Sequence, residues 1–263
     1  MTASRVFHIH YPMDRPIDTH VHLDMITDPD QAVARARSLG LGAIVAVGLD
    51  LESNRRTLEL AAKHADMVRP ALGAHPWAIR ETDWKDNLAF LKKELPRSVA
   101  LGEVGLDYKV KVDKKLQQTV LWELLGLASV LNKPVSLHSR YSQQCCLQML
   151  QDARIVKAVF HWYSGPLDIL DHILDAGYYI SATPALAYSP SHQAALKHAP
   201  LNRILVETDA PEEYQGKQSE PADVFTTIDL LAGLKNQPSL DILAATTQNA
   251  LDFFGPEILF RVE

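Results

Sequence analysis

The stretch IDTHVHLD at residues 17–24 decides how the rest of the chain is interpreted. Side chains of a β-strand alternate between its two faces, so Asp18, His20 and His22 would all point the same way. Two imidazoles at this spacing can reach one metal ion, and the carboxylate is then available to orient one of them. A histidine pair that only packs or hydrogen-bonds at a strand end is the alternative, because so short a motif often arises by chance.

The composition is that of an ordinary globular protein. Of the 263 residues, 47% are hydrophobic and 22% are charged, which is enough apolar material for a sizeable core. The formal net charge of −6 gives the whole molecule no attraction to nucleic acid or to an anionic membrane. A site that handles phosphate groups would therefore need local lysine and arginine residues or bound metal cations.

The cysteines and the apolar runs indicate a cytoplasmic protein. Cys145 and Cys146 are adjacent, so they cannot close an ordinary long-loop disulfide, as expected in a reducing compartment. No apolar run approaches the ~20 residues of a membrane span, and the first residues lack the apolar region of a signal peptide. We expect no membrane association, and no obligate protein partner is evident. Cys145 falls in a probable helix, where the role of a small buried apolar residue is expected.

Residues 1–15 precede the first strong strand and form an N-terminal extension. They contain a second H-x-H pair, His8 and His10, within VFHIH at residues 6–10. This pair is a metal pair, part of an added strand, or part of a loosely attached extension. The last two are favoured because no carboxylate flanks it, whereas Asp18 and Asp24 flank the other pair.

Short apolar or β-branched runs alternate with amphipathic helical stretches from residue 17 onward. The predicted strands lie near residues 17–24, 43–47, 67–72, 98–101, 134–137, 155–160, 178–180 and 203–206. The predicted helices lie near residues 29–39, 51–64, 84–95, 115–131, 141–151, 166–175, 189–198, 221–234 and 239–254. Such alternation predicts a parallel sheet buried on both faces. Over this length it favours the α/β class and a single (β/α)₈ TIM-barrel domain at residues 16–263, with a doubly wound open sheet as the alternative.

Potential ligands follow most of the predicted strands. In α/β barrels the chemistry lies at the carboxyl ends of the strands. Those ends carry His20 and His22, His75 in GAHPW, Glu103 in GEVGLDY, His138 in HSR, His161 in HWYSG and Asp209 in ETDAP. Each residue alone has an ordinary explanation as a turn residue, a strand-end carboxylate, a helix cap or a member of an aromatic cluster. Because all of them fall at one rim, we expect them to form one site.

The chemistry that this set supports is hydrolysis with two metal ions. His20 and His22 suit one borderline cation, and His138 and His161 suit a second. Glu103 between them can bridge ions ~3.5–4 Å apart, which lowers the pKa of a shared water toward neutrality. Asp209 is the candidate general base for that water. The sequence contains no G-x-S-x-G elbow, no Walker A loop and no G-x-G-x-x-G after the first strand, so other common chemistries are poorly supported.

Six motifs, in this order along the chain, resemble the TatD-type metal-dependent hydrolases of the amidohydrolase superfamily: IDTHVHLD, GAHP, GEVGLDY, PVSLHSR, FHWYSG and ETDAP. The likeness extends from residue 17 to residue 255. It implies a barrel with two divalent ions (zinc, manganese, magnesium or nickel) and hydrolysis of the nuclease or phosphodiesterase type, in some members on DNA. Residue by residue it implies a metal shell of His20, His22, Glu103, His138, His161 and Asp209, with His75 as a neighbouring site residue. Glu103 stands where another branch of the superfamily has a modified lysine, which favours the TatD branch.

The chain also departs from the family pattern. HWYSG at residues 161–165 replaces the more usual HCFSG, with the histidine and glycine intact. GKQSEP at residues 216–221 resembles GKRNEP but lacks its arginine and asparagine, which predicts weaker phosphate contacts near the eighth strand. The N-terminal extension is also atypical of the family.

The leading hypothesis is a phosphodiester hydrolase of the deoxyribonuclease type, with DNA or another phosphodiester as substrate. Arg140 can hold a phosphate by a bidentate contact. A local basic lip is available from Lys109, Lys111, Lys114 and Lys115, although a solvated helix start also explains these lysines. Bases can stack on aromatic side chains, for which the candidates are Trp77, Trp162, Tyr108 and Tyr163, although packing at the barrel rim explains them equally.

Two other functions stay open at this point. One keeps the metal ions but changes the bond, to an amide, a lactone or a small phosphoester. The other is a catalytically silent protein that binds metal in the same pocket. Salt-sensitive oligonucleotide binding with phosphodiester turnover favours the first hypothesis, whereas turnover of neutral substrates alone, or inertness with metal bound, favours one of the others.

Overall fold

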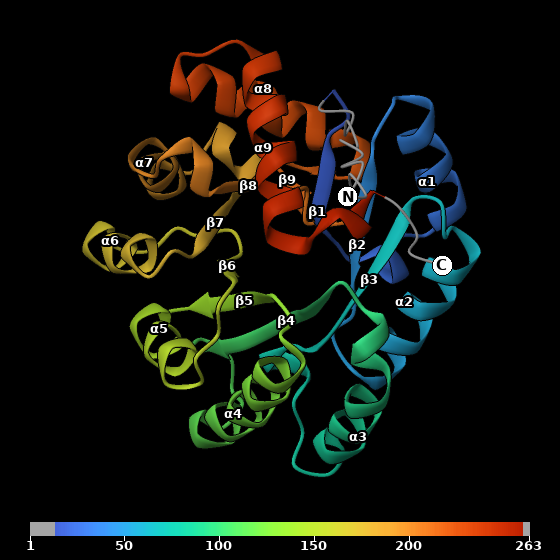
Figure 1. Ribbon diagram of the computed structural model, residues 1–263, viewed down its shortest axis with the longest axis vertical. Coiled ribbons are helices and arrows are strands. Elements are labelled where there is room, and N and C mark those ends of the chain that lie inside the picture. The colour runs from blue at the N-terminus through green and yellow to red at the C-terminus, as the bar shows by residue number, and fades with distance from the viewer. Residues whose placement is uncertain (1–13, 260–263) are drawn as a thin grey trace, which may run out of the picture.

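The computed structural model describes residues 14–259, and its centre is an eight-stranded parallel sheet with the strands in sequence order. The predicted (β/α)₈ barrel is therefore confirmed, and Figure 1 shows the helices arranged around the sheet. The strands are β1 Ile17–Val21, β2 Ala43–Val47, β3 Val68–Ala74, β4 Ala100–Asp107, β5 Val135–Arg140, β6 Ala158–Phe160, β7 Tyr179–Ala182 and β8 Ile204–Val206.

The helices agree closely with the predicted stretches. They are α1 Pro29–Ser38, α2 Leu51–Lys63, α3 Trp84–Glu94, α4 Lys114–Leu131, α5 Gln143–Asp152, α6 Leu167–Asp175, α7 Pro190–His198, α8 Val224–Lys235 and α9 Ser239–Phe254. Local capping explains the agreement: the side chain of Asp113 accepts a hydrogen bond from Leu116 N at the start of α4, and Asn132 ends that helix in the left-handed conformation. Within residues 14–259, no helix is long and apolar enough to cross a membrane.

The barrel closes between the first and last strands through few backbone contacts and one buried side-chain pair. A single bridge joins Val21 to Ala210. Beside it, the buried Asp18 carboxylate accepts hydrogen bonds from Thr208 N at 3.0 Å and Thr208 Oγ1 at 2.6 Å. The expectation that Asp18 orients an imidazole of the H-x-H pair is therefore wrong, because this carboxylate instead links β1 to the segment after β8.

Strand β4 is longer than predicted and includes Glu103. The prediction ended the strand near residue 101, whereas β4 continues to Asp107. Gly105, with a φ of +148°, lies directly against the His138 carbonyl of β5, where a Cβ would overlap that oxygen. The close approach of the two strands at this glycine places Glu103 next to His138.

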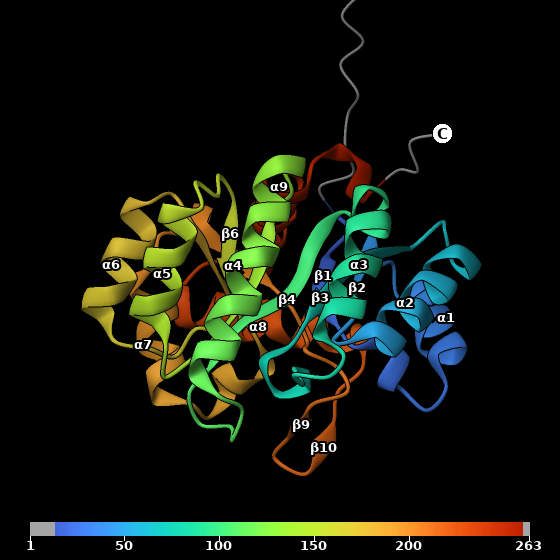
Figure 2. The same ribbon diagram turned by 90° about the horizontal axis from the view of Figure 1, so that it is seen from below.

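A short hairpin projects from the barrel beyond β8. Strands β9 Glu213–Tyr214 and β10 Lys217–Gln218 pair in antiparallel fashion, and Figure 2 shows them extending away from the body of the barrel. Its base is fixed by Tyr214, whose hydroxyl donates to Thr208 O at 2.9 Å. The hairpin therefore starts directly beside Asp209.

Candidate active site

Glu103 lies at the centre of the polar cluster, and its two carboxylate oxygens face different histidines. Oε2 lies 3.4 Å from His20 Nε2 and 3.3 Å from His22 Nε2. Oε1 lies 3.0 Å from His138 Nδ1 and 3.6 Å from His161 Nε2. One carboxylate and four imidazoles thus meet at the carboxyl end of the barrel. They come from β1, β4 and β5 and from the residues that directly follow β1 and β6.

Asp209 approaches the same space from the segment that follows β8. Its Oδ1 lies 3.3 Å from His22 Nε2 and 3.8 Å from His20 Nε2, and its Oδ2 lies 3.8 Å from His161 Nε2. Asp209 has a φ of +53°, a left-handed backbone conformation that costs free energy in a residue other than glycine. The chain keeps this conformation at the position where the carboxylate turns inward toward the histidines.

The cluster fits a metal ion on its own chemistry. Six buried side-chain nitrogen or oxygen atoms among the described residues have no hydrogen-bond partner, and three of them are His20 Nε2, Glu103 Oε2 and Asp209 Oδ1. Unpaired buried polar atoms are costly, so their convergence at one point indicates a partner such as a cation. Groups of ligand atoms within 4.8 Å of one another include His20, His22 and Asp209, and separately His75, Glu103 and His138.

Two further carboxylates, Glu207 and Asp107, orient histidines of the cluster and were not predicted as site residues. Glu207 Oε1 accepts from His161 Nδ1 at 2.7 Å and also from Ser181 Oγ and Trp162 N. Asp107 Oδ2 lies 3.2 Å from His138 Nε2. For Glu207 a signal was available, because it directly follows β8 at the carboxyl end of the barrel, where the predicted site residues gather.

The outer nitrogens of the H-x-H pair also have partners. His22 Nδ1 lies 3.2 Å from the Val47 carbonyl oxygen, and His20 Nδ1 lies 3.2 Å from Ser136 Oγ. A carbonyl oxygen only accepts, so His22 carries a proton on Nδ1, and Nε2, which faces Glu103 and Asp209, is the atom that could bind a metal. This is the arrangement found in metal-bound histidines.

The histidines keep both central carboxylates ionised. Burial disfavours a charged carboxylate, but His75 and the surrounding imidazoles hold the pKa of Glu103 well below its usual value. In Asp209, burial is likewise outweighed by His161 and His22, which lower its pKa. Burial also opposes the protonation of His161, yet Glu207 and Asp209 raise its pKa to about 10. The two ionised carboxylates therefore attract positive charge into the space between them.

The two residues expected to contact substrate lie in different surroundings. His75 is 1% exposed, with Nε2 3.3 Å from Glu103 Oε1, and Nδ1 accepts from Trp77 N at 3.2 Å. Arg140 ends β5 with an exposed side chain and pairs in register with Asp107 of β4. The structure therefore brings His75 into the cluster and leaves Arg140 at its rim.

The rim residues proposed to contact nucleic acid are only partly available. The four lysines Lys109, Lys111, Lys114 and Lys115 are exposed, with Lys114 Nζ 4.5 Å above the Tyr108 ring. Trp77 is 56% exposed, and Trp162 is half-buried. The suggestion that Tyr163 stacks on bases is wrong, because this side chain is 1% exposed and its hydroxyl donates to Pro166 O.

The remaining predictions concern the cysteines and the second H-x-H pair. Cys145 lies on α5 as expected but is half-buried, and it accepts a hydrogen bond from the Tyr108 hydroxyl at 3.4 Å. Cys146 is the fully buried member of the pair. The His8 and His10 pair lies outside the described residues 14–259.

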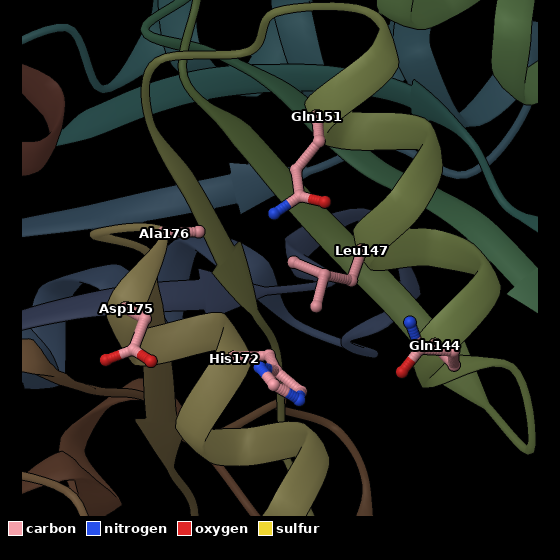
Figure 3. A pocket seen from close by; sticks show the side chains of 6 residues that line it. All are labelled: Gln144, Leu147, Gln151, His172, Asp175 and Ala176. Carbon is pink, nitrogen blue, oxygen red and sulfur yellow. The ribbon is translucent and has the colours of Figure 1, made fainter.

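Two cavities in the described part of the chain lie away from the polar cluster. One, of about 370 Å³, opens between α5 and α6, where Gln144, Leu147 and Gln151 face His172 and Asp175 (Figure 3). The other, of about 280 Å³, lies at the amino ends of the strands and includes Lys133 and Phe253.

A closed parallel barrel with clustered histidines and carboxylates at its carboxyl end is typical of metal-dependent hydrolases. The sequence profile described as TatD related DNase matches residues 17–255. The chain belongs to this family.

Individual relatives agree with this assignment. The human protein named "Deoxyribonuclease TATDN3" is 29% identical over 257 residues, which cover 90% of this chain and 94% of that protein. The "3'-5' ssDNA/RNA exonuclease TatD" of Edwardsiella piscicida is 31% identical over 244 residues, covering 86% of this chain and 93% of that protein. The crystal structure of YjjV, a TatD homologue from Escherichia coli, matches with a TM-score of 0.82 at 28% identity, covering 92% of this chain and 98% of that one.

Proposed function

We propose that this protein hydrolyses phosphodiester bonds of nucleic acid with a water molecule activated between two divalent ions. The observation that carries the proposal is the division of donors around Glu103. One carboxylate oxygen faces His20 and His22, and the other faces His138 and His161. A carboxylate placed in this way could serve two ions, which lie ~3.5–4 Å apart in two-metal sites.

The residues divide naturally between the two ions. His20, His22 and Asp209, with Glu103 Oε2, would hold one ion, because the two histidine Nε2 atoms lie 3.3–3.8 Å from the two carboxylate oxygens. His138 and His161, with Glu103 Oε1, would hold the other. Nitrogen and carboxylate donors suit zinc, manganese, nickel or magnesium in different degrees, so the donor set fixes the class of ion and not its identity.

When bound, two such ions lower the pKa of a shared water toward neutrality and stabilise charge on a phosphoryl oxygen. Asp209 is the group placed to accept the proton of that water, because it is ionised and faces the same space as His22 and His161. Glu207 and Asp107 hold the imidazoles of His161 and His138 in fixed orientations. The rigid strands thus keep the acceptor and the ligand atoms in place before substrate binds.

The rim supports a phosphodiester as substrate. Arg140 ends the strand that carries His138 and lies two residues beyond it on the same strand face, from which its guanidinium could hold a phosphate next to the cluster by two parallel hydrogen bonds. Lys109 and Lys111 follow the Glu103 strand and add exposed positive charge. The exposed ring of Trp77, whose centroid lies 4.0 Å from that of His75, offers a stacking surface. The names of the human and Edwardsiella relatives, a deoxyribonuclease and a single-stranded DNA and RNA exonuclease, agree with this substrate class.

The test compares substrates on the metal-loaded protein and its Arg140→Ala variant. We expect turnover of a single-stranded oligonucleotide, with KM in the variant raised about tenfold or more, because a charge-assisted contact contributes about 1.5–3 kcal/mol. KM for a neutral lactone or amide, if turned over, should not change. Arg154→Ala is the matched control, since Arg154 is exposed next to the cavity at the amino ends of the strands.

The same experiment separates the alternatives. Turnover of neutral amides or lactones without turnover of any phosphodiester would replace the proposal by the second hydrolase hypothesis. A metal-loaded protein inert toward all substrates would indicate a metal-binding protein. An equal rise of KM for charged and neutral substrates would remove Arg140 from phosphate recognition.

A further inference from the structure

Five histidines surround Glu103, and each has one ring nitrogen facing the cluster and one facing an outer partner. The outer partner decides the tautomer, and the tautomer decides whether the inner nitrogen can bind a metal. His22 faces the Val47 carbonyl, His161 faces Glu207, and His138 faces Asp107, all of which accept hydrogen bonds. The outer partner of His20 is the Ser136 hydroxyl, which can also accept. These four rings can therefore carry their proton outside and direct a lone pair inward.

His75 is the exception among the five. Its outer nitrogen, Nδ1, accepts a hydrogen bond from the backbone N–H of Trp77 at 3.2 Å. A nitrogen that accepts holds no proton, so in the neutral ring the proton is on Nε2. Nε2 is the atom that lies 3.3 Å from Glu103 Oε1. His75 therefore presents an N–H group to the cluster and not a lone pair.

The backbone fixes this tautomer. Pro76 has no N–H, so the first amide available to cap the turn Pro76–Ala78 is that of Trp77, and it points at the His75 ring. His75 N donates to Leu49 O at 2.8 Å, which holds the residue in place. For Nε2 to coordinate an ion, Nδ1 would have to carry the proton and face the Trp77 N–H, donor against donor, in a side chain that is 1% exposed.

Resting on the proposed two-ion function, we propose that His75 is a positioning residue that donates Nε2–H to Glu103 Oε1, and that it is not a metal ligand. Proximity alone suggests otherwise, because ligand atoms of His75, Glu103 and His138 lie within 4.8 Å of one another. The hydrogen bond holds the carboxylate so that Oε2 faces His20 and His22. It also withdraws electron density from Oε1, which makes an ion held there by His138 and His161 more electrophilic.

Two substitutions separate donation from coordination. His75→Gln reaches as far as Nε2 and keeps an N–H that can donate to Glu103. His75→Asn reaches only as far as Nδ1, so it can still accept from Trp77 N but no longer reaches Glu103. His138→Ala is the control for loss of a true ligand, because it leaves no donor where Nδ1 of His138 faces Glu103, and it should lose ion content.

Ion content per chain, the visible spectrum of the cobalt-substituted protein and kcat on an oligonucleotide would be measured for each variant. We expect wild-type ion content and a ligand-field spectrum of unchanged coordination number in both His75 variants. We expect kcat to fall about 10–100-fold in His75→Asn and to be largely restored in His75→Gln. A loss of ion content in either His75 variant, matching that of His138→Ala, would overturn the proposal, as would equal kcat in the two variants.

Nitrogen NMR of the ¹⁵N-histidine-labelled wild-type protein tests the tautomer directly. It requires neither a correctly folded variant nor turnover. We expect the His75 ring to show the neutral tautomer with a protonated Nε2 and an unprotonated Nδ1, both without and with zinc. A protonated Nδ1 would refute the proposed role of His75. A change in the Nε2 chemical shift on addition of zinc, like that of the coordinating rings, would refute it as well. If no phosphodiester is hydrolysed, the proposed function fails, while ion content and tautomer still decide the role of His75.

Discussion

The hydrogen bond between Glu207 and His161 holds a proposed metal ligand in its orientation. Its contribution can be tested by a substitution that replaces one carboxylate oxygen with an amide nitrogen. Glu207 Oε1 accepts from His161 Nδ1 at 2.7 Å, Ser181 Oγ at 2.7 Å and Trp162 N at 3.2 Å. Glu207→Gln preserves the shape and a carbonyl oxygen but removes the charge. We expect this change to weaken the binding of the ion held by His138 and His161.

The magnitude follows from the His161 contact alone, because the bonds from Ser181 and Trp162 do not reach the ion. A hydrogen bond to an ionised group contributes about 1.5–3 kcal/mol, against about 1 kcal/mol for a neutral one. The substitution therefore costs roughly 0.5–2 kcal/mol, or about 2–30-fold in the dissociation constant of that ion. Loss of an outer partner of a metal-bound histidine costs about 10–100-fold in general, which overlaps this range.

The assay is a competition titration of both ions against a chromophoric chelator. We expect the affinity on the His20 and His22 side to change less than that on the His161 side, since Glu207 hydrogen-bonds to His161 and not to His20 or His22. Glu213→Gln on β9 removes the same charge at an exposed position and serves as control. Two unchanged affinities in a folded Glu207→Gln protein, or a loss confined to the His20 and His22 side, would refute the reasoning.

Three other predictions follow from the same structure. Asp209→Asn should keep most metal binding but lower kcat by ~10²-fold or more, because Asn cannot accept the proton of the attacking water; unchanged kcat would remove Asp209 as the base. Asp18→Ala should lower the free energy of unfolding by roughly 2–4 kcal/mol in urea, since Thr208 N and Oγ1 lose their acceptor. Asp18→Asn should cost less, because burial raises the pKa of Asp18 and so favours an uncharged group there, and equal costs for the two variants would contradict this. Burial lowers the pKa of His192 from 6.5 to about 4, so the unfolded chain takes up a proton below pH 6.5 that the folded protein takes up only near pH 4. Stability should therefore fall by about 3 kcal/mol as the pH drops through this window, and His192→Gln should remove that part of the slope in denaturation measured at several pH values; an unchanged slope would exclude His192 as its source.

Local signals explain why the element boundaries could be predicted from the sequence. Asp28 and Asp50 cap α1 and α2 by accepting from Gln31 N and Ser53 N, and such caps are visible as single residues. The order of the strands follows from the regular alternation of apolar and amphipathic runs. The length of β4 could not be predicted, because it depends on the contact of Gly105 with the neighbouring strand.

The candidate ligands were predictable as a set because one rim collects the carboxyl ends of all strands. Their outer partners were not, since the pairing of His161 with Glu207 joins residues 46 positions apart and depends on how two strands sit in the barrel. Asp18 shows the same limit: strand alternation gave its face, but Thr208, 190 positions away, determines its contact. Tyr163 was misassigned because a rim motif does not reveal that its ring turns into the core.

The central claim is that divalent ions held around Glu103 carry out the hydrolysis of a phosphodiester. The direct measurement is the metal content of the purified protein and of Glu103→Ala, paired with oligonucleotide turnover before chelation, after chelation and after divalent metal is restored. The account predicts two ions per chain, loss of turnover with the ions, recovery with added metal, and neither ions nor turnover in Glu103→Ala. Full turnover by the metal-free protein or by Glu103→Ala would contradict it.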